Sequence, residues 1–350
     1  MFSITGKHYN QIRLRYMMKY EAVTIKDIAK ALGISTSTVS RALRDSYEIS
    51  PETKALVLEC AEKLNYKPNP AALSLKERRT RSIGVIVCEI ANNFFSQTID
   101  GIESIAYDKG YNIIITQSHE SFDREVAILN FLASRSVDGL LVSVSTETND
   151  ISHFKELHDR GLPIVFFDRV VDEINTHKVT LDNFKGTYEA TEHLIQNGFK
   201  RIAAIVNSEF LLITHERLAG YKEALLNNGL EVDNSLIKHC FYGGIEAQEV
   251  EEAVNQLLTL KPRPDAILCT SDKLTTGCMS ALSRRRIKIP DEIALIGFTN
   301  SNVSELMQTP LSVIKQPANE MGRQAAELLL QIVESKRPIK DFEKRVLTPE

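Results

Sequence analysis

The spacing of apolar residues changes character once along the chain, at about Ser82. Before that point the apolar positions repeat with a helical period and predict three short helices within residues 23–67. The first two helices are joined by a tight turn at Gly33, a residue suited to the left-handed backbone that ends a helix. Thr24 and Ser35 stand where helix N-caps are expected. The pattern therefore predicts a small helical head.

After this point, short and continuous apolar runs alternate with helical patterns. Such runs predict strands that are buried on both faces, and the alternation is typical of an α/β fold with parallel sheets between helices. The pattern runs once before about residue 170 and again after about residue 200, which indicates two similar lobes, each with a doubly wound parallel sheet. The seven runs are IGVIV (83–87), YNIII (111–115), DGLLV (138–142), PIVFF (163–167), RIAAIV (201–206), DAILC (265–269) and IALIGF (293–298).

Residues 65–82, NYKPNPAALSLKERRTRS, join the two patterns. Two prolines interrupt any long helix, yet Asn69 can cap two helical turns that begin at Pro70. A helix over 70–76 is well below the ~12–15 residues that are marginal alone in water, so we expect it to form only with help. The segment 76–81 then predicts an exposed basic linker.

Charge divides the chain at the same place. The net charge is −4, but residues 1–81 hold 15 basic against 8 acidic residues, which leaves 27 and 38 for the rest. A basic head on an acidic body suggests that the head binds a polyanion, although a solvated basic face would show the same charge. The five cysteines form no CxxC pair, which is typical of reduced thiols in a cytoplasm. No membrane span, secretory signal, P-loop, dinucleotide motif or GxSxG motif occurs, so no cofactor or metal is predicted.

The second predicted helix carries an unusual run of hydroxyl residues, Ser35, Thr36, Ser37 and Thr38. Ser and Thr are mediocre helix formers, so their use here needs a reason. A helix N-terminus suits phosphate, and small hydroxyl side chains there can donate to phosphates or touch base edges in a major groove. Arg41 lies on roughly the same face and can bind a guanine bidentately. A hydroxyl-rich capped helix occurs in other domains too, but with these basic surroundings it favours DNA binding.

The segments TIKDIAKALGISTSTVSRALRD and ISPETKALVLECAEKLNYKPNPAALSLK resemble the lactose-repressor/galactose-repressor family of bacterial transcription regulators. The likeness runs from residue 23 to about 349 and includes SIGVIV, ERLAGYKEAL, SDKLTTGCMSAL and PLSVIKQP. The resemblance implies a helix-turn-helix head, a short hinge helix and a two-lobed body like a periplasmic binding protein, which binds a small effector. It also implies a homodimer that binds palindromic operator DNA in the bacterial cytoplasm, at the nucleoid.

We therefore expect an N-terminal tail (1–22), a DNA-binding head (23–67), a hinge helix and linker (68–81) and an effector-binding and dimerisation body (82–350). Within the body, we expect one lobe to contain about 82–180 plus 299–317, and the other about 181–298 plus 318–350. No leucine heptads follow VLTPE, so the family's tetramer-forming tail is not expected.

The expected DNA-contacting residues, carried over from the family's motif, are Thr24, Ser35, Thr36, Ser37, Thr38, Arg41, Asn69 and Leu75. Of these, Ser37, Thr38 and Arg41 are the expected base readers, and the two N-cap residues match phosphate-contacting caps. Leu75 matches the hinge leucine that wedges into the minor groove, where an apolar side chain can kink DNA. Ordinary packing in a small helix is the alternative for Leu75.

The expected effector-binding residues are Phe94, Phe95, Asp168, Arg169, Arg217 and Asp272. Asp272 follows a predicted strand at its carboxyl end, where open α/β sheets bind ligands, and it resembles the family's effector-binding Asp. Arg217 matches the family's cleft Arg, and a structural ion pair is the alternative for the charged residues. Phe94 and Phe95 offer aromatic faces to a sugar or base, with core packing as an equal alternative. Thr299 stands where many relatives of the family carry Asp. It is therefore in doubt whether this position provides the polar contact that the Asp makes in those relatives.

The combined features predict a DNA-binding transcription regulator, most simply a repressor, whose operator affinity is controlled by a small effector. A sugar or sugar derivative is favoured over a purine, since the positions near Leu211 and Ile213 are apolar where purine-binding relatives tend to be polar. A global regulator controlled by a protein corepressor and a sugar-binding protein without a DNA role are the alternatives. An enzyme is disfavoured because the eight His show no metal spacing or triad partner.

Overall fold

The computed structural model describes residues 23–67, 79–301 and 311–350. Contacts within the chain divide it between Thr80 and Arg81 into two units, a head and a body. The predicted tail, the predicted hinge helix and two predicted DNA-contacting residues, Asn69 and Leu75, lie outside the described residues.

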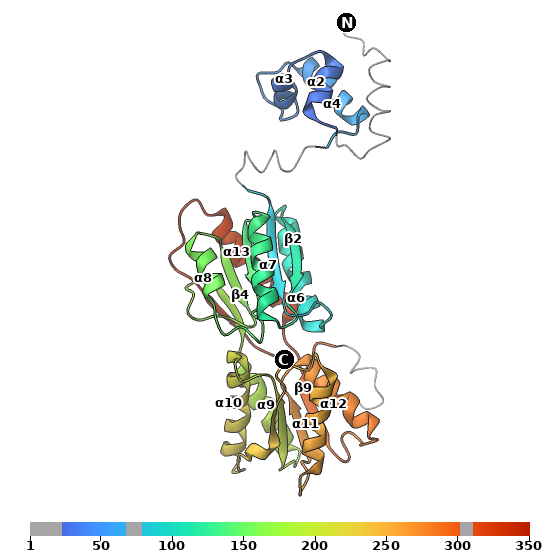
Figure 1. Cartoon of the computed structure of the whole chain (residues 1–350), viewed down its shortest axis with the longest axis vertical. Helices are drawn as coiled ribbons and strands as arrows, with labels where there is room; N and C mark the ends of the chain where they lie inside the picture. Colours follow the sequence, from blue (N-terminus) through green and yellow to red (C-terminus); the bar gives the residue numbers. More distant parts are fainter. Residues whose placement is uncertain (1–22, 68–78, 302–310) are drawn as a thin grey trace. The chain divides into compact units, whose positions relative to one another are not determined.

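The head contains the three predicted helices (Figure 1). They are α2 (Ile25–Leu32), α3 (Thr36–Ala42) and α4 (Pro51–Lys63). Gly33 ends α2 with a φ of 68°, a backbone conformation that glycine adopts without strain. Each helix contributes one apolar face to a shared core, with Ile28, Val39 and Val57 fully buried in it. The head therefore has a core of its own.

At the start of each head helix, a side chain accepts a hydrogen bond from a backbone amide that has no partner within the helix. The Asp27 carboxylate accepts hydrogen bonds from the Thr24 amide at 2.9 Å and from the Thr24 hydroxyl at 2.6 Å. Ser35 Oγ accepts from the Thr38 amide at 3.1 Å. Ser50 Oγ accepts from the Thr53 amide of α4 at 3.3 Å. The first two helix starts follow the predicted capping residues, Thr24 and Ser35.

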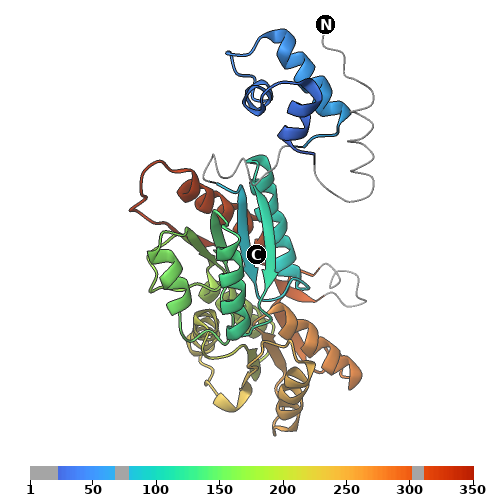
Figure 2. The same cartoon turned by 45° about the horizontal axis from the view of Figure 1, so that its top comes forward.

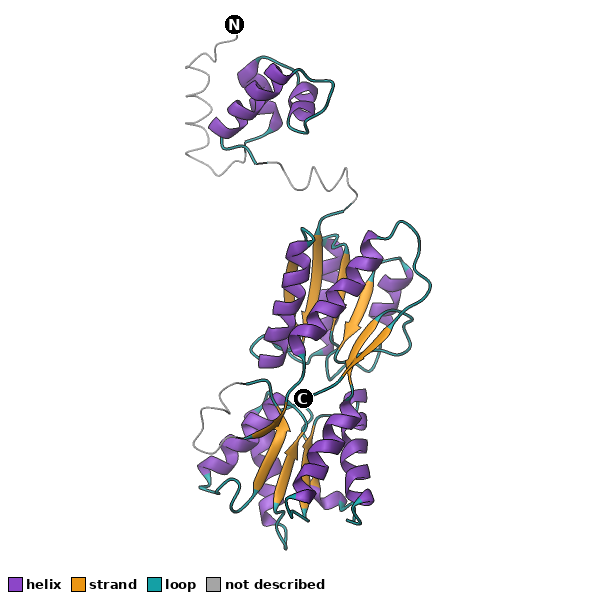
Figure 3. Ribbon diagram, turned by 180° about the vertical axis from the view of Figure 1, so that it is seen from behind, coloured by secondary structure: helices purple, strands orange, loops and turns teal. Residues whose placement is uncertain are grey.

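The body consists of two lobes, each a parallel sheet between two layers of helices (Figure 3). The first lobe has the strand order β11-β5-β4-β3-β1-β2, and the second has β10-β9-β8-β6-β7. The first lobe contains β1 (Ser82–Val87), β2 (Asn112–Gln117), β3 (Gly139–Val142), β4 (Ile164–Phe167), β5 (Lys178–Leu181), β11 (Lys344–Leu347), α6 (Asn93–Asp108), α7 (Phe122–Ser134), α8 (Ser152–Asp159) and α13 (Ala318–Glu334). The second contains β6 (Ile202–Val206), β7 (Ile237–His239), β8 (Ala266–Cys269), β9 (Ala294–Phe298), β10 (Ser312–Ile314), α9 (Asn183–Gln196), α10 (Leu212–Asn227), α11 (Ala247–Thr259), α12 (Asp272–Arg284) and the short 3₁₀ helix η1 (Asn234–Leu236).

All seven apolar runs form strands, which confirms the predicted α/β class. The strands that the pattern missed are β5, β7, β10 and β11. Three of these lie at sheet edges, and they are short and carry polar residues such as Lys344 and His239. These three edge strands lack the long continuous apolar run that marks a strand buried on both faces.

The expected division of the carboxyl-terminal segments between the lobes is wrong. Strand β10 pairs with β9 in the second sheet, whereas β11 pairs with β5 in the first. Helix α13 packs closely against α6 of the first lobe. A Cβ atom on Gly101 would lie 2.0 Å from the carbonyl oxygen of Asn319, and one on Gly322 would lie 2.0 Å from that of Thr98. The two glycines let the helix backbones touch, and this contact assigns residues 318–334 to the first lobe.

Figure 2 shows the same two-lobed body from a second direction, with α13 beside the sheet of the first lobe. The chain passes between the lobes after β5, again before α13, and a third time after β11, where Glu350 and Lys315 exchange backbone hydrogen bonds of 2.8 and 2.9 Å. Residues from both lobes are therefore adjacent along these crossings.

Candidate DNA-binding surface and effector site

The hydroxyl residues at the start of α3 form a connected group. Ser35 Oγ lies 2.7 Å from Ser37 Oγ and 2.8 Å from Thr38 Oγ1. Ser35, Thr36 and Ser37 are exposed, whereas Val39 on the opposite face is fully buried in the head core. The structure thus brings the predicted hydroxyl donors together at a helix N-terminus on the solvent side. Such a surface suits phosphate and base edges.

Arg41, near the end of α3, forms an ion pair with Glu48. The Nη1 and Oε2 atoms are 3.0 Å apart, and the two side chains are 58% and 45% exposed. Glu48 belongs to the loop between α3 and α4 and was not among the residues that the sequence singled out. An acidic residue in a basic head was the only signal that could have indicated it.

In the body, loops that follow strands of the two lobes contact each other. Glu89 follows β1 of the first lobe, and its carboxylate lies 3.1 Å from Nζ of Lys273 at the start of α12. Gln97 of α6 accepts a hydrogen bond of 2.8 Å from Nδ2 of Asn300. The carboxyl ends of parallel strands are where open α/β sheets bind ligands. This junction is therefore the candidate effector site.

Arg217 is held in the junction by three contacts. It is only 3% exposed, and its Nε donates to Asn183 Oδ1 at 2.8 Å. Its Nη1 donates to the carbonyl of Thr270, which follows β8. The guanidinium lies over the ring of Phe298, 4.0 Å from the ring centre. Burial lowers the pKa of Arg217 to about 10, so the side chain stays charged at neutral pH.

Asp272 begins α12, and its carboxylate accepts a hydrogen bond from the hydroxyl of Thr299. Thr299 Oγ1 accepts in turn from the Ser301 amide at 3.1 Å. Thr299 thus provides a hydroxyl partner at the position where the resemblance left a polar contact in doubt. The sequence showed the threonine but not its partner.

Asp168 and Arg169 follow β4 and are both buried. Asp168 has a φ of 58°, which is uncommon for a residue with a side chain. Its carboxylate accepts a long hydrogen bond of 3.5 Å from Ser143. Burial raises the pKa of Asp168, although the charges of Arg169 and Arg217 oppose the shift. Burial in the fold therefore disfavours the charged form of this carboxylate.

Arg169 is paired with Glu120, a residue that the sequence did not indicate. Nη1 of Arg169 lies 2.6 Å from Oε2 of Glu120, which also accepts from the Thr146 amide at 2.8 Å. Burial by itself would raise the pKa of Glu120, but the charge of Arg169 and these hydrogen bonds outweigh it and lower the pKa. The pair is ionised and largely shielded from water.

Three buried polar atoms at this junction lack a hydrogen-bond partner among the described residues: Arg169 Nε, Asn207 Oδ1 and Thr214 Oγ1. Each residue is more than nine-tenths buried. A Cβ atom on Gly243 would lie 3.6 Å from Asn207 Oδ1 and 4.0 Å from an oxygen of Glu120, so groups of the two lobes face each other here. Buried polar atoms are normally hydrogen-bonded, so these three atoms mark the junction as a candidate binding site.

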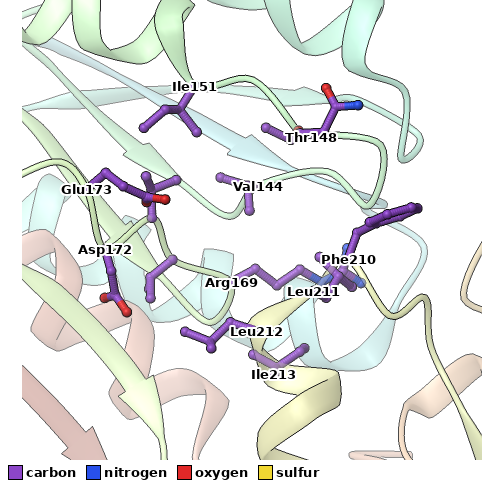
Figure 4. Close-up of a pocket in the computed structure, with 13 residues that line it drawn as sticks. Val144, Thr148, Ile151, Arg169, Asp172, Glu173, Phe210, Leu211, Leu212 and Ile213 are labelled. Carbon is purple, nitrogen blue, oxygen red and sulfur yellow. The ribbon is translucent and has the colours of Figure 1, made fainter.

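A pocket of about 330 Å³ opens between the lobes beside these groups (Figure 4). Arg169 extends from its loop towards Leu211 at the start of α10, while Asp172 lies on the opposite side of the pocket. Leu211 and Ile213 line the pocket and are themselves buried. The apolar positions that the sequence connected with effector choice therefore lie at the pocket.

The two aromatic residues expected at the effector site are packed differently from the charged ones. Phe94 and Phe95, at the start of α6, are buried in the body's apolar core. Their rings lie edge to face with centres 5.2 Å apart. These contacts are those of the core-packing alternative, and effector contact by either ring stays a prediction.

The described residues contain no candidate metal site, disulfide or membrane-spanning helix. Within them, no group of three His, Cys, Asp or Glu side chains is placed to bind a metal ion. All five cysteines are buried and free. None of the helices in the described ranges is long and apolar enough to cross a membrane.

Both units, the head and the body, match models of known protein families. Residues 24–69 match the bacterial regulatory proteins of the lacI family, and residues 80–346 match the periplasmic binding proteins and sugar binding domain of the LacI family. The HTH-type transcriptional repressor PurR of Vibrio atlanticus is 33% identical over 323 residues, which cover 92% of this chain and 94% of that protein.

Solved structures show the same architecture. The transcriptional regulator CelR in its cellobiose complex has a TM-score of 0.68 at 27% identity, covering 94% of this chain and 98% of that chain. The lac repressor dimer bound to operator and the anti-inducer ONPF has a TM-score of 0.79 at 23% identity, covering 94% and 97%, and shows the fold. With a head that matches the family's regulatory domain and a body that matches its binding domain, the chain belongs to the LacI family of DNA-binding transcription regulators.

Proposed function

We propose that the protein is a repressor that binds a palindromic operator as a homodimer in the bacterial cytoplasm, and that a sugar or sugar derivative bound between the lobes changes its affinity for the operator. The observation that carries the proposal is the set of unpartnered buried polar atoms at the lobe junction, beside a pocket. It is supported by the exposed hydroxyl and arginine surface of α3. The role is regulatory, and the proposal assigns no catalysis to the chain.

In the head, the proposal gives a task to the N-cap Ser35 and to three of the predicted residues of α3. The helix N-terminus and the hydroxyl of Ser35 bind a phosphate, which positions the helix without reading sequence. Ser37, Thr38 and Arg41 then face base edges in the major groove, where arginine pairs best with guanine. Thr24, at the start of α2, provides a second phosphate contact. All five residues belong to one compact unit.

The polar side chains of the lobe junction, beside the pocket, favour a ligand with several hydroxyl groups. Asp272 and Asp168 can accept hydrogen bonds from hydroxyls, and Arg217 and Asn207 can complete the set. Apolar side chains on one wall, such as Leu211, suit the less polar face of a sugar ring. The cellobiose complex of CelR supports this class of ligand by analogy.

A purine effector is the second candidate, because PurR proteins are among the relatives at 33% identity. It requires donors and acceptors in the plane of a flat base. The apolar pair at Leu211 and Ile213 is the feature that argues against it.

The test begins with the operator. Duplexes that the full-length protein selects from a randomised pool provide the DNA, and thermal unfolding with a panel of mono- and disaccharides and purine bases identifies the effector. We expect a sugar to raise the melting temperature and to change operator affinity about 5–150-fold, the range of a coupling of about 1–3 kcal/mol.

Asp272→Asn should remove that response and leave operator affinity in the absence of sugar unchanged. The matched control is Asp291→Asn, which makes the same substitution at an exposed position of the second lobe. If only the purine bases of the panel bind, the effector is a purine, the second candidate, and the sugar proposal is wrong. An Asp272→Asn variant with a normal response would show that the site is elsewhere.

A further inference from the structure

The loop that carries Glu48 is held in place by contacts on both sides. The Ser46 amide donates to the carbonyl of Arg41 at 3.1 Å, and the Ile49 amide donates to the carbonyl of Ser46 at 3.3 Å. The Lys54 ammonium group of α4 lies 2.6 Å from the carboxylate of Asp45. The loop is therefore attached to the ends of both α3 and α4. Glu48 reaches Arg41 from this attached backbone.

The stability of the head does not explain the Arg41–Glu48 pair. Exposed ion pairs contribute about 0–1 kcal/mol, because water competes for both charges. A carboxylate beside a DNA-binding helix also repels phosphates, which reduces binding to any DNA sequence. Its presence there calls for a role in recognition.

An arginine near DNA can contact either a phosphate or a base edge, and only the second contact reads sequence. The guanidinium has five N–H donors in a fixed plane, so one donor can bind Glu48 while two others reach a guanine. A carboxylate in that position fixes the plane of the guanidinium. It also disfavours the swing of Arg41 towards a phosphate, because the swing would break the ion pair.

We propose that Glu48 is a specificity-determining residue, whose carboxylate directs Arg41 to a base edge and keeps it from the phosphates. The proposal rests on the proposed role of Arg41 as a base reader. Glu48 thus acts through Arg41 and lowers binding to non-cognate DNA more than binding to the operator.

The head contains a matched control for this role. Glu59 and Lys63 form an exposed ion pair within α4, with their charged atoms 2.5 Å apart and side chains 59% and 49% exposed. Glu59→Gln therefore removes the same charge from the same unit and breaks the same kind of pair. It differs from Glu48→Gln in leaving Arg41 untouched.

The experiment measures binding of the full-length protein and its variants to a duplex selected by the wild-type protein and to a scrambled duplex, over a range of salt concentrations. Glu48→Gln should bind the scrambled duplex more tightly, with a salt slope steeper by about 0.9 because one more phosphate is contacted. The ratio of operator to scrambled affinity should fall at least about fivefold. Glu59→Gln should change both affinities alike and leave the slope unchanged.

A double variant shows whether Glu48 acts through Arg41. In an Arg41→Ala background, Glu48→Gln should no longer change the affinity ratio, since coupled residues give non-additive effects. A Glu48→Gln protein with the ratio and salt slope of Glu59→Gln overturns the proposal. Failure of the base-reader role itself gives a different result: Arg41→Ala then selects the same DNA motif as the wild-type protein. Thermal unfolding confirms that each variant is folded.

Discussion

The head and the body use charged side chains in different ways. In the head, the Arg41–Glu48 pair is largely exposed to water. In the body, the Arg169–Glu120 pair is only 10% and 5% exposed. Exposed pairs contribute about 0–1 kcal/mol, whereas loss of one partner of a buried pair costs about 3–5 kcal/mol. The charges of the head can therefore exchange water for DNA at little cost to folding, while those of the body are part of its fold and are already oriented for a ligand.

The two units also differ in how their elements are stabilised. The head helices are short and begin at capping residues such as Ser35 and Ser50, which act within one helical turn. The body depends on contacts between distant segments, such as the touch of α6 and α13 at Gly101 and Gly322. Changes in the head should thus have local effects, and changes in the body should affect the whole unit.

The largest expected effect is on the buried pair of the body. Glu120→Ala leaves the Arg169 guanidinium buried without its carboxylate, so we expect the free energy of unfolding to fall by about 3–5 kcal/mol. Urea unfolding followed by circular dichroism measures the change. The control is Glu156→Ala, which breaks the exposed Arg160–Glu156 pair of the same lobe and should cost less than about 1 kcal/mol. Equal losses for the two variants would break the comparison.

A second prediction uses the sign of a pH dependence. The folded pKa of Asp168 is raised by burial, so the stability contributed by its protonated form is full below the unfolded pKa of about 3.9 and is lost as pH rises through the folded pKa. Asn has no charge and tolerates a left-handed backbone. We expect Asp168→Asn to stabilise the body by about 0.5–2 kcal/mol at pH 7, the range that single stabilising substitutions commonly give. Urea unfolding at pH 7 and pH 4 should show a smaller gain at pH 4.

Asp45 in the head serves as a control, because its pKa is shifted in the opposite direction from that of Asp168. Asp45 is exposed, and its hydrogen bond and ion pair with Lys54 lower its pKa. A lowered pKa contributes stability above the unfolded value, and this is lost as pH falls through the folded value. Asp45→Asn should therefore destabilise the head at pH 7 and have less effect at acid pH. Variants of Asp45 and Asp168 that respond to pH in the same direction would contradict the comparison.

The smallest expected effect is on a helix cap of the head. Ser35→Ala removes the acceptor for the Thr38 amide and should cost the head about 1 kcal/mol. Amide hydrogen exchange should become faster in the head and stay unchanged in the body. Ser40→Ala is the control, because it lies inside the same helix, where alanine is favourable. Faster exchange throughout the body after Ser35→Ala would show that the two units are not independent.

The sequence by itself determined the features that depend on neighbouring residues. The caps at Thr24 and Ser35 and the helix end at Gly33 act within one turn, so residue order is enough to find them. The central strands could be predicted because strands buried on both faces need continuous apolar runs. Asp272 and Arg217 could be proposed as site residues because one follows a predicted strand and the other matches a family motif.

The tertiary structure alone decided the contacts between residues of different elements. Nothing near Glu48 in sequence shows that it reaches Arg41, and nothing near Thr299 shows that it bonds Asp272. The placement of α13 and β11 in the first lobe depended in the same way on the close approach of α13 to α6 and on the pairing of β11 with β5. Residue order specifies which faces are apolar, but an edge strand or a terminal helix can complete either of two similar sheets. The choice between them is made by packing, because only the folded chain shows which surfaces fit.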